Sequence, residues 1–82
     1  MTWSVQWEPE ATNQVAGFLK ADPTGVAAVL DACDALEGGP MAAGSSAWGP
    51  YHRRLRSGPW RILYRIDEDT QTIDVEHVGR SA

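Results

Sequence analysis

Hydrophobic and polar positions recur with two different periods along this chain, and the periods divide it into strands and helices. Residues 2–7 alternate between apolar and polar side chains, which is typical of a strand with one buried face. From Pro9 to Leu19 the apolar residues form one helical stripe, which predicts a helix with proline at its first position. A second stripe predicts another helix, which follows Asp22 as its N-cap and ends at the Gly-Gly-Pro of residues 38–40.

The second half of the chain returns to an alternating pattern. Residues 41–50 are small and rich in Gly and Ser, so they are expected to form a loop. Three strands are expected after it, over residues 51–56, 60–66 and 72–78. The order β-α-α-β-β-β predicts an α+β fold, in which two N-terminal helices pack on one face of a small antiparallel sheet.

The need to bury one face of each strand also predicts how the strands pair. A register that places Leu55 beside Ile62 turns the apolar side chains of both strands toward the helices. The same register sets Arg56 directly opposite Arg61 on the exposed face. Like charges in that position destabilise a sheet, so such a cluster suggests an anionic partner, of which phosphate is the commonest.

The exposed face is expected to be strongly basic although the whole chain is acidic. The chain carries 11 acidic and 7 basic residues, yet no acid occurs between Gly38 and Ile66, where every base is arginine. Arginine offers the planar donor fork that suits phosphate and carboxylate. A solvated strand face, with Asp74 paired to Arg65, is the alternative interpretation. The basic residues expected on this face are His52, Arg54, Arg56, Arg61, Arg65 and Arg80.

Alternation in the last strand assigns its residues to the two faces. His77 has the same parity as Ile73 and Val75, so it is expected to face the helices, with Val78 and Arg80 on the exposed face.

Three aromatic residues can be placed in the same way. Tyr51 and Tyr64 are expected on the apolar face. Trp48 precedes the basic strand, and it is expected either to pack against the protein or to stack on a nucleic-acid base.

Length and composition narrow the class of protein. A chain of 82 residues suits a single domain over residues 1–82, because two domains would each be too small to bury a core. The lone Cys33 excludes an internal disulfide and lies on the second helical stripe, so it is expected in the core. Two histidines and one cysteine argue against structural zinc, and no cofactor is expected. Without a signal-peptide pattern or about 20 consecutive apolar residues, we expect a soluble, cytoplasmic protein with no membrane partner.

Several segments together resemble the RelE/ParE toxin superfamily. Residues 54–66 resemble its central hairpin, and the Val-Gly-Arg of residues 78–80 looks like its closing strand. Residues 7–11 are similar to its opening, and Trp48-Gly49 lies where its Leu-x-Gly loop motif falls. The resemblance covers essentially the whole chain and implies the toxin of a bacterial type II toxin–antitoxin pair.

One branch of this superfamily cleaves mRNA in the ribosomal A site, and the other poisons DNA gyrase. The resemblance implies that the catalytic residues are His52, Arg54, Arg61 and Arg80. In a strict alignment, however, the family's C-terminal arginine falls on Ser81, next to Arg80. Because arginines are poor bases, His52 is the expected proton acceptor. Phosphate binding is expected from a wider set: Arg54, Arg56, Arg61, Arg65 and Arg80.

These features favour a ribosome-dependent mRNA endonuclease that inhibits translation. The family's C-terminal tyrosine segment has no counterpart before Ala82, so cleavage is expected to be weak. That difference leaves two alternatives: a ParE-like gyrase inhibitor without nuclease activity, or a toxin fold that has lost activity and only binds an antitoxin. In each case the expected partner is a cognate antitoxin, with mRNA on the ribosome or DNA gyrase as the target.

Overall fold

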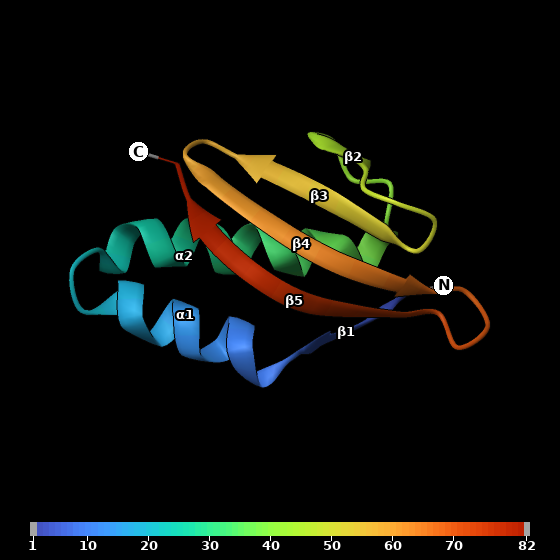
Figure 1. Cartoon of the computed structure of the whole chain (residues 1–82), viewed down its shortest axis with the longest axis horizontal. Helices are drawn as coiled ribbons and strands as arrows, with labels where there is room; N and C mark the ends of the chain where they lie inside the picture. Colours follow the sequence, from blue (N-terminus) through green and yellow to red (C-terminus); the bar gives the residue numbers. More distant parts are fainter. Residues whose placement is uncertain (1, 82) are drawn as a thin grey trace.

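Five strands and two α-helices make up most of residues 2–81, the part of the chain that the computed structural model describes (Figure 1). The strands are β1 (Ser4–Trp7), β2 (Ser45–Ala47), β3 (His52–Ser57), β4 (Trp60–Asp67) and β5 (Thr72–Arg80). The helices are α1 (Pro9–Leu19) and α2 (Pro23–Asp34), and α2 continues into the short 3-10 helix η1 (Ala35–Gly38).

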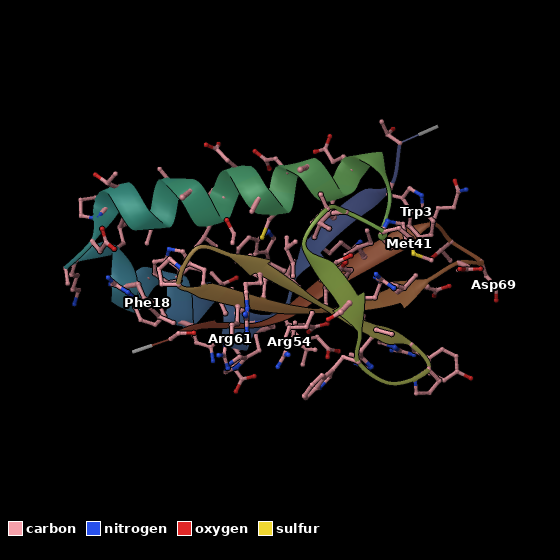
Figure 2. All side chains as sticks on the ribbon, turned by 90° about the horizontal axis from the view of Figure 1, so that it is seen from above. Trp3, Phe18, Met41, Arg54, Arg61 and Asp69 are labelled. Atoms are coloured by element: carbon pink, nitrogen blue, oxygen red, sulfur yellow. The ribbon has the colours of Figure 1, made fainter. Side chains whose placement is uncertain are left out.

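The strands form one sheet in the order β1-β5-β4-β3-β2. α2 covers one face of this sheet, and the opposite face is called the open face below (Figures 1 and 2). Figure 1 shows α2 crossing behind the sheet while α1 runs beside β5. The α+β architecture with two N-terminal helices is therefore confirmed. None of the helices described over residues 2–81 is long and apolar enough to cross a membrane.

The sheet differs from the expected one in two places. β1 runs parallel to β5, so the sheet is mixed rather than wholly antiparallel. The parallel pairing is possible because β1 and β5 are not joined by a tight turn. The two helices after β1 carry the chain from one edge of the sheet to β2 at the other edge. The segment expected to be a loop contains β2, which pairs antiparallel with β3. The side chains of β2 are small and largely exposed. The sequence therefore has no alternating apolar positions that would indicate this strand.

The start of α2 is fixed by its predicted N-cap. The Gly25 N–H donates to Asp22 Oδ1 at 2.9 Å, which satisfies one of the free donors of the first turn. A Cβ on Gly25 would lie 2.2 Å from Asp22 Oδ2, so glycine is required for this close approach. Asp22 also forms an ion pair with Arg80, whose Nη1 lies 3.2 Å from Asp22 Oδ2, and this pair ties the end of β5 to the start of α2.

The core lies between the helices and the sheet, where the predicted apolar stripes meet. Burial raises the pKa of the Cys33 thiol to about 12, and the nearby charge of Asp34 adds to the effect. Tyr64 is fully buried, and its hydroxyl donates to the Pro40 carbonyl. Tyr51 is 63% exposed, so its expected place in the core was wrong. The buried cluster is Ala11, Val29, Cys33, Leu36, Leu55, Trp60, Ile62, Tyr64, Ile73, Val75 and Val78.

The pairing of β3 with β4 is confirmed. Leu55 lies opposite Ile62 and Arg56 lies opposite Arg61, as burial of one face requires. The same pairing sets His52 opposite Arg65.

A β-bulge in β5 changes the faces on which its later residues lie. Leu63 pairs with His77 while Tyr64 pairs with Val75, so Glu76 is an extra residue between two paired positions. Beyond the bulge, Val78 is buried and His77 is exposed. The predicted orientations of His77 and Val78 were therefore wrong, because strict alternation does not survive an inserted residue.

Candidate functional site

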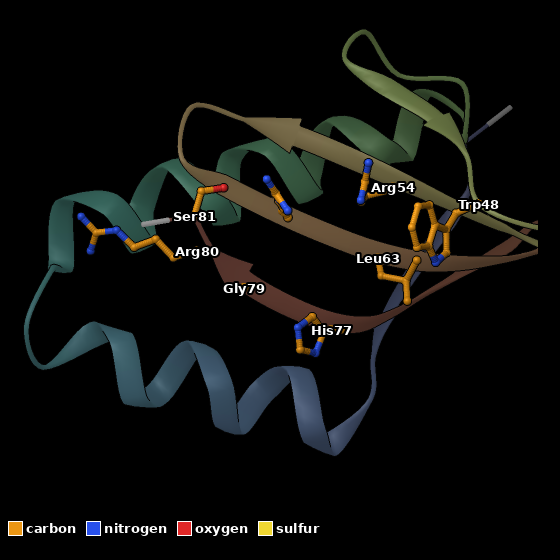
Figure 3. A pocket seen from close by; sticks show the side chains of 8 residues that line it. Trp48, Arg54, Leu63, His77, Gly79, Arg80 and Ser81 are labelled. Carbon is orange, nitrogen blue, oxygen red and sulfur yellow. The ribbon is translucent and has the colours of Figure 1, made fainter.

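The open face of the sheet holds a shallow depression of about 330 Å³ over β3, β4 and β5. Figure 2 shows Arg54 and Arg61 extending from the sheet on the side away from α2. Figure 3 shows Arg54, Leu63 and His77 around the depression, with Trp48 at one end and Ser81 at the other. The residues that line it are Trp48, Arg54, Arg61, Leu63, His77, Gly79, Arg80 and Ser81.

Alternation along two neighbouring strands brings the arginines together. Arg54 on β3 and Arg61 on β4 both have the parity of the open face, opposite to that of buried Leu55 and Ile62. None of the lining side chains is acidic, among the residues that the structure describes. The depression is therefore an electropositive site that suits an anion.

Trp48 forms one wall of the depression through its contact with an arginine. The guanidinium carbon of Arg54 lies 4.4 Å from the centre of the Trp48 ring, a cation–π contact that holds both side chains. The backbone N–H of Trp48 donates to the backbone carbonyl of His52 at 2.9 Å, which fixes the loop that carries the ring. Trp48 is 52% exposed, so a broad aromatic surface faces solvent.

His52 lies on the open face beside the depression and is held by a carboxylate. Its Nε2 is 2.9 Å from Glu76 Oε1, the extra residue of the bulge. Because the ionised carboxylate only accepts, Nε2 carries the proton in this contact, and in the neutral imidazole Nδ1 then keeps the lone pair. His52 precedes Arg54 by two positions on the same face of β3, so its imidazole lies on the same side of the sheet as the arginines.

The bulge places His77 on the open face of the sheet, and a residue of α1 holds its ring there. Gln14 Nε2 lies 2.8 Å from His77 Nδ1, and Gln14 Oε1 accepts the Val78 N–H at 2.7 Å. Sequence reasoning missed His77 as a site residue. The signal in the sequence is the three-residue spacing of Val75 and Val78, since both are buried only if an extra residue lies between them.

Arg80 was predicted on the open face, and its orientation differs. The register places it opposite buried Trp60 at the end of β5, and its guanidinium lies 5.4 Å from the Trp60 ring centre. Its ion pair with Asp22 draws the charge toward the start of α2, and Figure 3 shows the side chain pointing away from Arg54. Arg80 therefore contributes to the rim of the depression, while its charged end has a structural contact.

The remaining predicted residues lie on the open face but outside the lining of the depression. Arg56 is exposed at the end of β3, and Arg65 is exposed on β4. The register places Asp74 opposite Arg65, but the ion pairs among residues 2–81 do not include the predicted pair of these two side chains. Within residues 2–81 there is no group of three or more His, Cys, Asp or Glu side chains that could hold a metal ion. The depression thus combines Arg54 and Arg61, the aromatic wall of Trp48 and the imidazole of His77, with the imidazole of His52 next to it.

The sequence matches a known family over nearly its whole length. Residues 5–82 match the family described as the ParE toxin of the type II toxin–antitoxin system parDE. The chain belongs to this family, and thus to the RelE/ParE toxin superfamily. No curated protein sequence matches the chain significantly.

Solved toxin structures have the same fold. The chain is similar to a chain of the RelBE2 toxin–antitoxin complex of Mycobacterium tuberculosis, with TM-score 0.83 and 23% identity over 98% of this chain and 99% of that one. It is similar to the isolated RelE toxin of E. coli, with TM-score 0.79 and 13% identity over 98% and 85%. A chain of the chromosomal ParDE system of P. aeruginosa gives TM-score 0.79 and 15% identity over 99% and 98%.

Proposed function

We propose that this toxin cleaves mRNA on the ribosome in the cytoplasm, and that a cognate antitoxin blocks it. The observation that carries the proposal is the depression that Arg54 and Arg61 line, with His52 beside it on the same open face. The RelE-like fold supports a toxin of this class, and the geometry supports phosphodiester chemistry.

In the proposed reaction, Arg54 and Arg61 stabilise the negative charge on the phosphate, and His52 accepts the proton of the ribose 2′-hydroxyl. In this reaction the ribose 2′-oxygen attacks phosphorus while His52 Nδ1 takes its proton. The bond from phosphorus to the 5′-oxygen breaks, and that oxygen takes a proton from water. The products are a 2′,3′-cyclic phosphate and a 5′-hydroxyl end. Arg54 and Arg61 offer fixed donors to the phosphoryl oxygens, where negative charge grows.

Glu76 gives His52 its orientation in this scheme. The contact of 2.9 Å holds the Nε2–H and leaves Nδ1 as the proton acceptor, which follows the nucleophile–base–carboxylate logic of many hydrolases. The carboxylate also stabilises the imidazolium that forms when His52 takes the proton.

Trp48 supplies a surface for a nucleobase next to the reacting phosphate. One face of its ring is covered by Arg54, while the side chain remains half exposed. Base–aromatic stacking contributes about 1–3 kcal/mol per base and tolerates any sequence. A single-stranded RNA would therefore stack on Trp48 while its phosphate lies between the arginines.

Gyrase inhibition is the second candidate function, and the match to the ParE toxin family favours it. On this hypothesis the basic face binds the enzyme or its DNA, and the toxin cuts nothing. The carboxylate-held His52 and the depression would then be contact surface without chemistry.

Two assays with the purified toxin separate the candidates. Ribosomes that carry a short mRNA are incubated with wild type or His52→Gln, and cut ends are mapped by primer extension. We expect cuts with wild type and a rate at least tenfold lower for His52→Gln, because a proton acceptor contributes about 10²–10⁴-fold. Gyrase supercoiling should proceed unchanged. Inhibited supercoiling with intact mRNA would support the ParE-like candidate, and no effect in either assay would indicate a toxin fold without activity.

The antitoxin is the partner that the fold predicts. Several solved chains with this fold come from toxin–antitoxin complexes, including the archaeal RelE–RelB complex of Pyrococcus horikoshii. An acidic antitoxin segment would neutralise the self-repelling arginines of β3 and β4. Binding to wild type should weaken as salt is raised, whereas a triple alanine variant of Arg54, Arg56 and Arg61 should bind less tightly and respond less to salt. Equal affinities and equal salt slopes would place antitoxin binding elsewhere on the surface.

A further inference from the structure

The side-chain amide of Gln14 can be oriented without ambiguity. The backbone N–H of Val78 can only donate, and it lies 2.7 Å from one end of the amide, which must therefore be the carbonyl oxygen Oε1. The other end, the NH₂ group of Nε2, then faces the imidazole of His77 at 2.8 Å from Nδ1. Gln14 thus links α1 to two consecutive residues of β5.

This orientation fixes the tautomer of His77. The Gln14 NH₂ group can only donate, so Nδ1 must accept with its lone pair. In the neutral ring the proton then lies on Nε2. His52 shows the contrasting arrangement, because its partner Glu76 accepts and leaves the His52 lone pair free.

The Nε2–H of His77 is accessible from the depression. His77 is exposed and lines the depression together with Arg54 and Arg61. A Cβ on Gly79 would lie 3.2 Å from His77 Nε2, closer than most such contacts, so glycine at this position leaves the nitrogen uncrowded. Figure 3 shows the ring between β5 and α1, on the same side of the sheet as Arg54 and Leu63.

We propose that His77, held by Gln14 as the Nε2–H tautomer, donates a hydrogen bond to a phosphoryl oxygen of RNA bound in the depression. This role deepens the proposed mRNA cleavage and rests on it. Three donors from three strands, Arg54, Arg61 and His77, then surround one anion. His77 keeps its proton throughout the reaction, so it differs from His52, which takes one.

The tautomer is measured directly by NMR on the ¹⁵N-labelled free toxin. Long-range ¹H–¹⁵N correlations of the imidazole should show Nε2 protonated and Nδ1 unprotonated in wild type. Gln14→Glu presents a carboxylate that still accepts the Val78 N–H but also accepts from His77, so Nδ1 should become protonated. Nδ1 protonated in wild type would overturn the proposal.

Titration with a short RNA that carries 2′-O-methyl groups tests the contact without cleavage. We expect the Nε2–H resonance of His77 to move as the RNA binds at low salt. A resonance that stays in place while other signals from the depression move would overturn the donor role. This readout does not depend on whether the toxin cleaves mRNA.

Cleavage on programmed ribosomes tests the same role in the reaction. Loss of one donor to a developing oxyanion should slow His77→Ala and Gln14→Glu by about tenfold to a hundredfold, while His77→Gln, which keeps an N–H donor, retains more of the rate. Asn13→Glu adds the same charge to α1 next to Gln14 and should retain nearly the wild-type rate.

The outcomes distinguish the two proposals. If wild type cleaves mRNA and His77→Ala cleaves equally fast, the role of His77 is wrong while the proposed function stands. If wild type cuts nothing but the Nε2–H resonance moves on RNA titration, the proposed cleavage is wrong while the donor contact stands.

Discussion

The opposed arginines of β3 and β4 allow charge repulsion and catalysis to be measured on a matched pair of variants. Arg56 and Arg61 face each other across the two strands, and both are exposed. Only Arg61 lines the depression. Replacing either by glutamine removes the repulsion and keeps part of the side-chain stem. The two variants should therefore change stability alike and activity differently.

The stability change follows from the cross-strand geometry. Opposed like charges destabilise a sheet by about 0.2–1 kcal/mol. An unfolding entropy of about 2.1 cal/mol/K per residue gives roughly 0.17 kcal/mol/K for this chain, so each variant should melt about 1–6 °C higher. Raising the salt concentration should shrink this gain, because exposed charges are screened over about 10 Å at 0.1 M.

The activity change should separate the two variants. A hydrogen bond to a charged group contributes about 1.5–3 kcal/mol, so Arg61→Gln should slow single-turnover cleavage by about 10- to 150-fold. The cleavage rate of Arg56→Gln should stay within about threefold of the wild-type rate, because Arg56 does not line the depression and would contact only a phosphate outside it. Equal losses for both variants, or a lower melting temperature for both, would refute this reasoning.

Three further variants test contacts around the site and the core. Asp22→Ala removes the α2 cap and the ion pair with Arg80, so the melting temperature should fall by about 6 °C for a cap that contributes about 1 kcal/mol, while cleavage is retained. Burial raises the pKa of the Cys33 thiol from 9.0 to about 12, so the folded state keeps a proton that the unfolded state loses. The free energy of unfolding in urea should therefore fall as pH rises from 9 toward 12, and less steeply in Cys33→Ala. Glu76→Gln should slow cleavage about tenfold without weakening RNA binding, because His52 loses the partner that stabilises its charged form.

The fold was largely predictable because burial of one face imposes a period on each long element. Leu55 and Ile62 had to meet on the helix side, and that requirement alone gave the pairing of β3 with β4. Asp22 before Pro23 marked the start of α2 for an equally local reason.

The strand that has no buried face could not be predicted in this way. Residues 45–47 have small side chains, and their strand exists through its backbone pairing with β3. The parallel pairing of β1 with β5 could not be predicted either. The alternation of apolar and polar residues in β1 is the same for a parallel and an antiparallel partner.

The site was predicted in part, and the bulge explains most of the difference. Arg54 and Arg61 were placed together correctly, since both lie in regular strands. His77 and Arg80 follow the extra residue Glu76, so they lie on the faces opposite to those that strict alternation gave. The partners of the two histidines are far away in the chain, and only the folded structure brings Gln14 to His77.

Mapping mRNA 5′ ends in cells that express the toxin without its antitoxin tests the central claim most directly. The account predicts new 5′-hydroxyl ends inside translated regions when wild type is expressed. It also predicts their loss in cells that express Arg61→Gln at the same level. Growth arrest with intact transcripts, or equal cutting by wild type and Arg61→Gln, would contradict the claim that the arginine-lined depression cleaves mRNA.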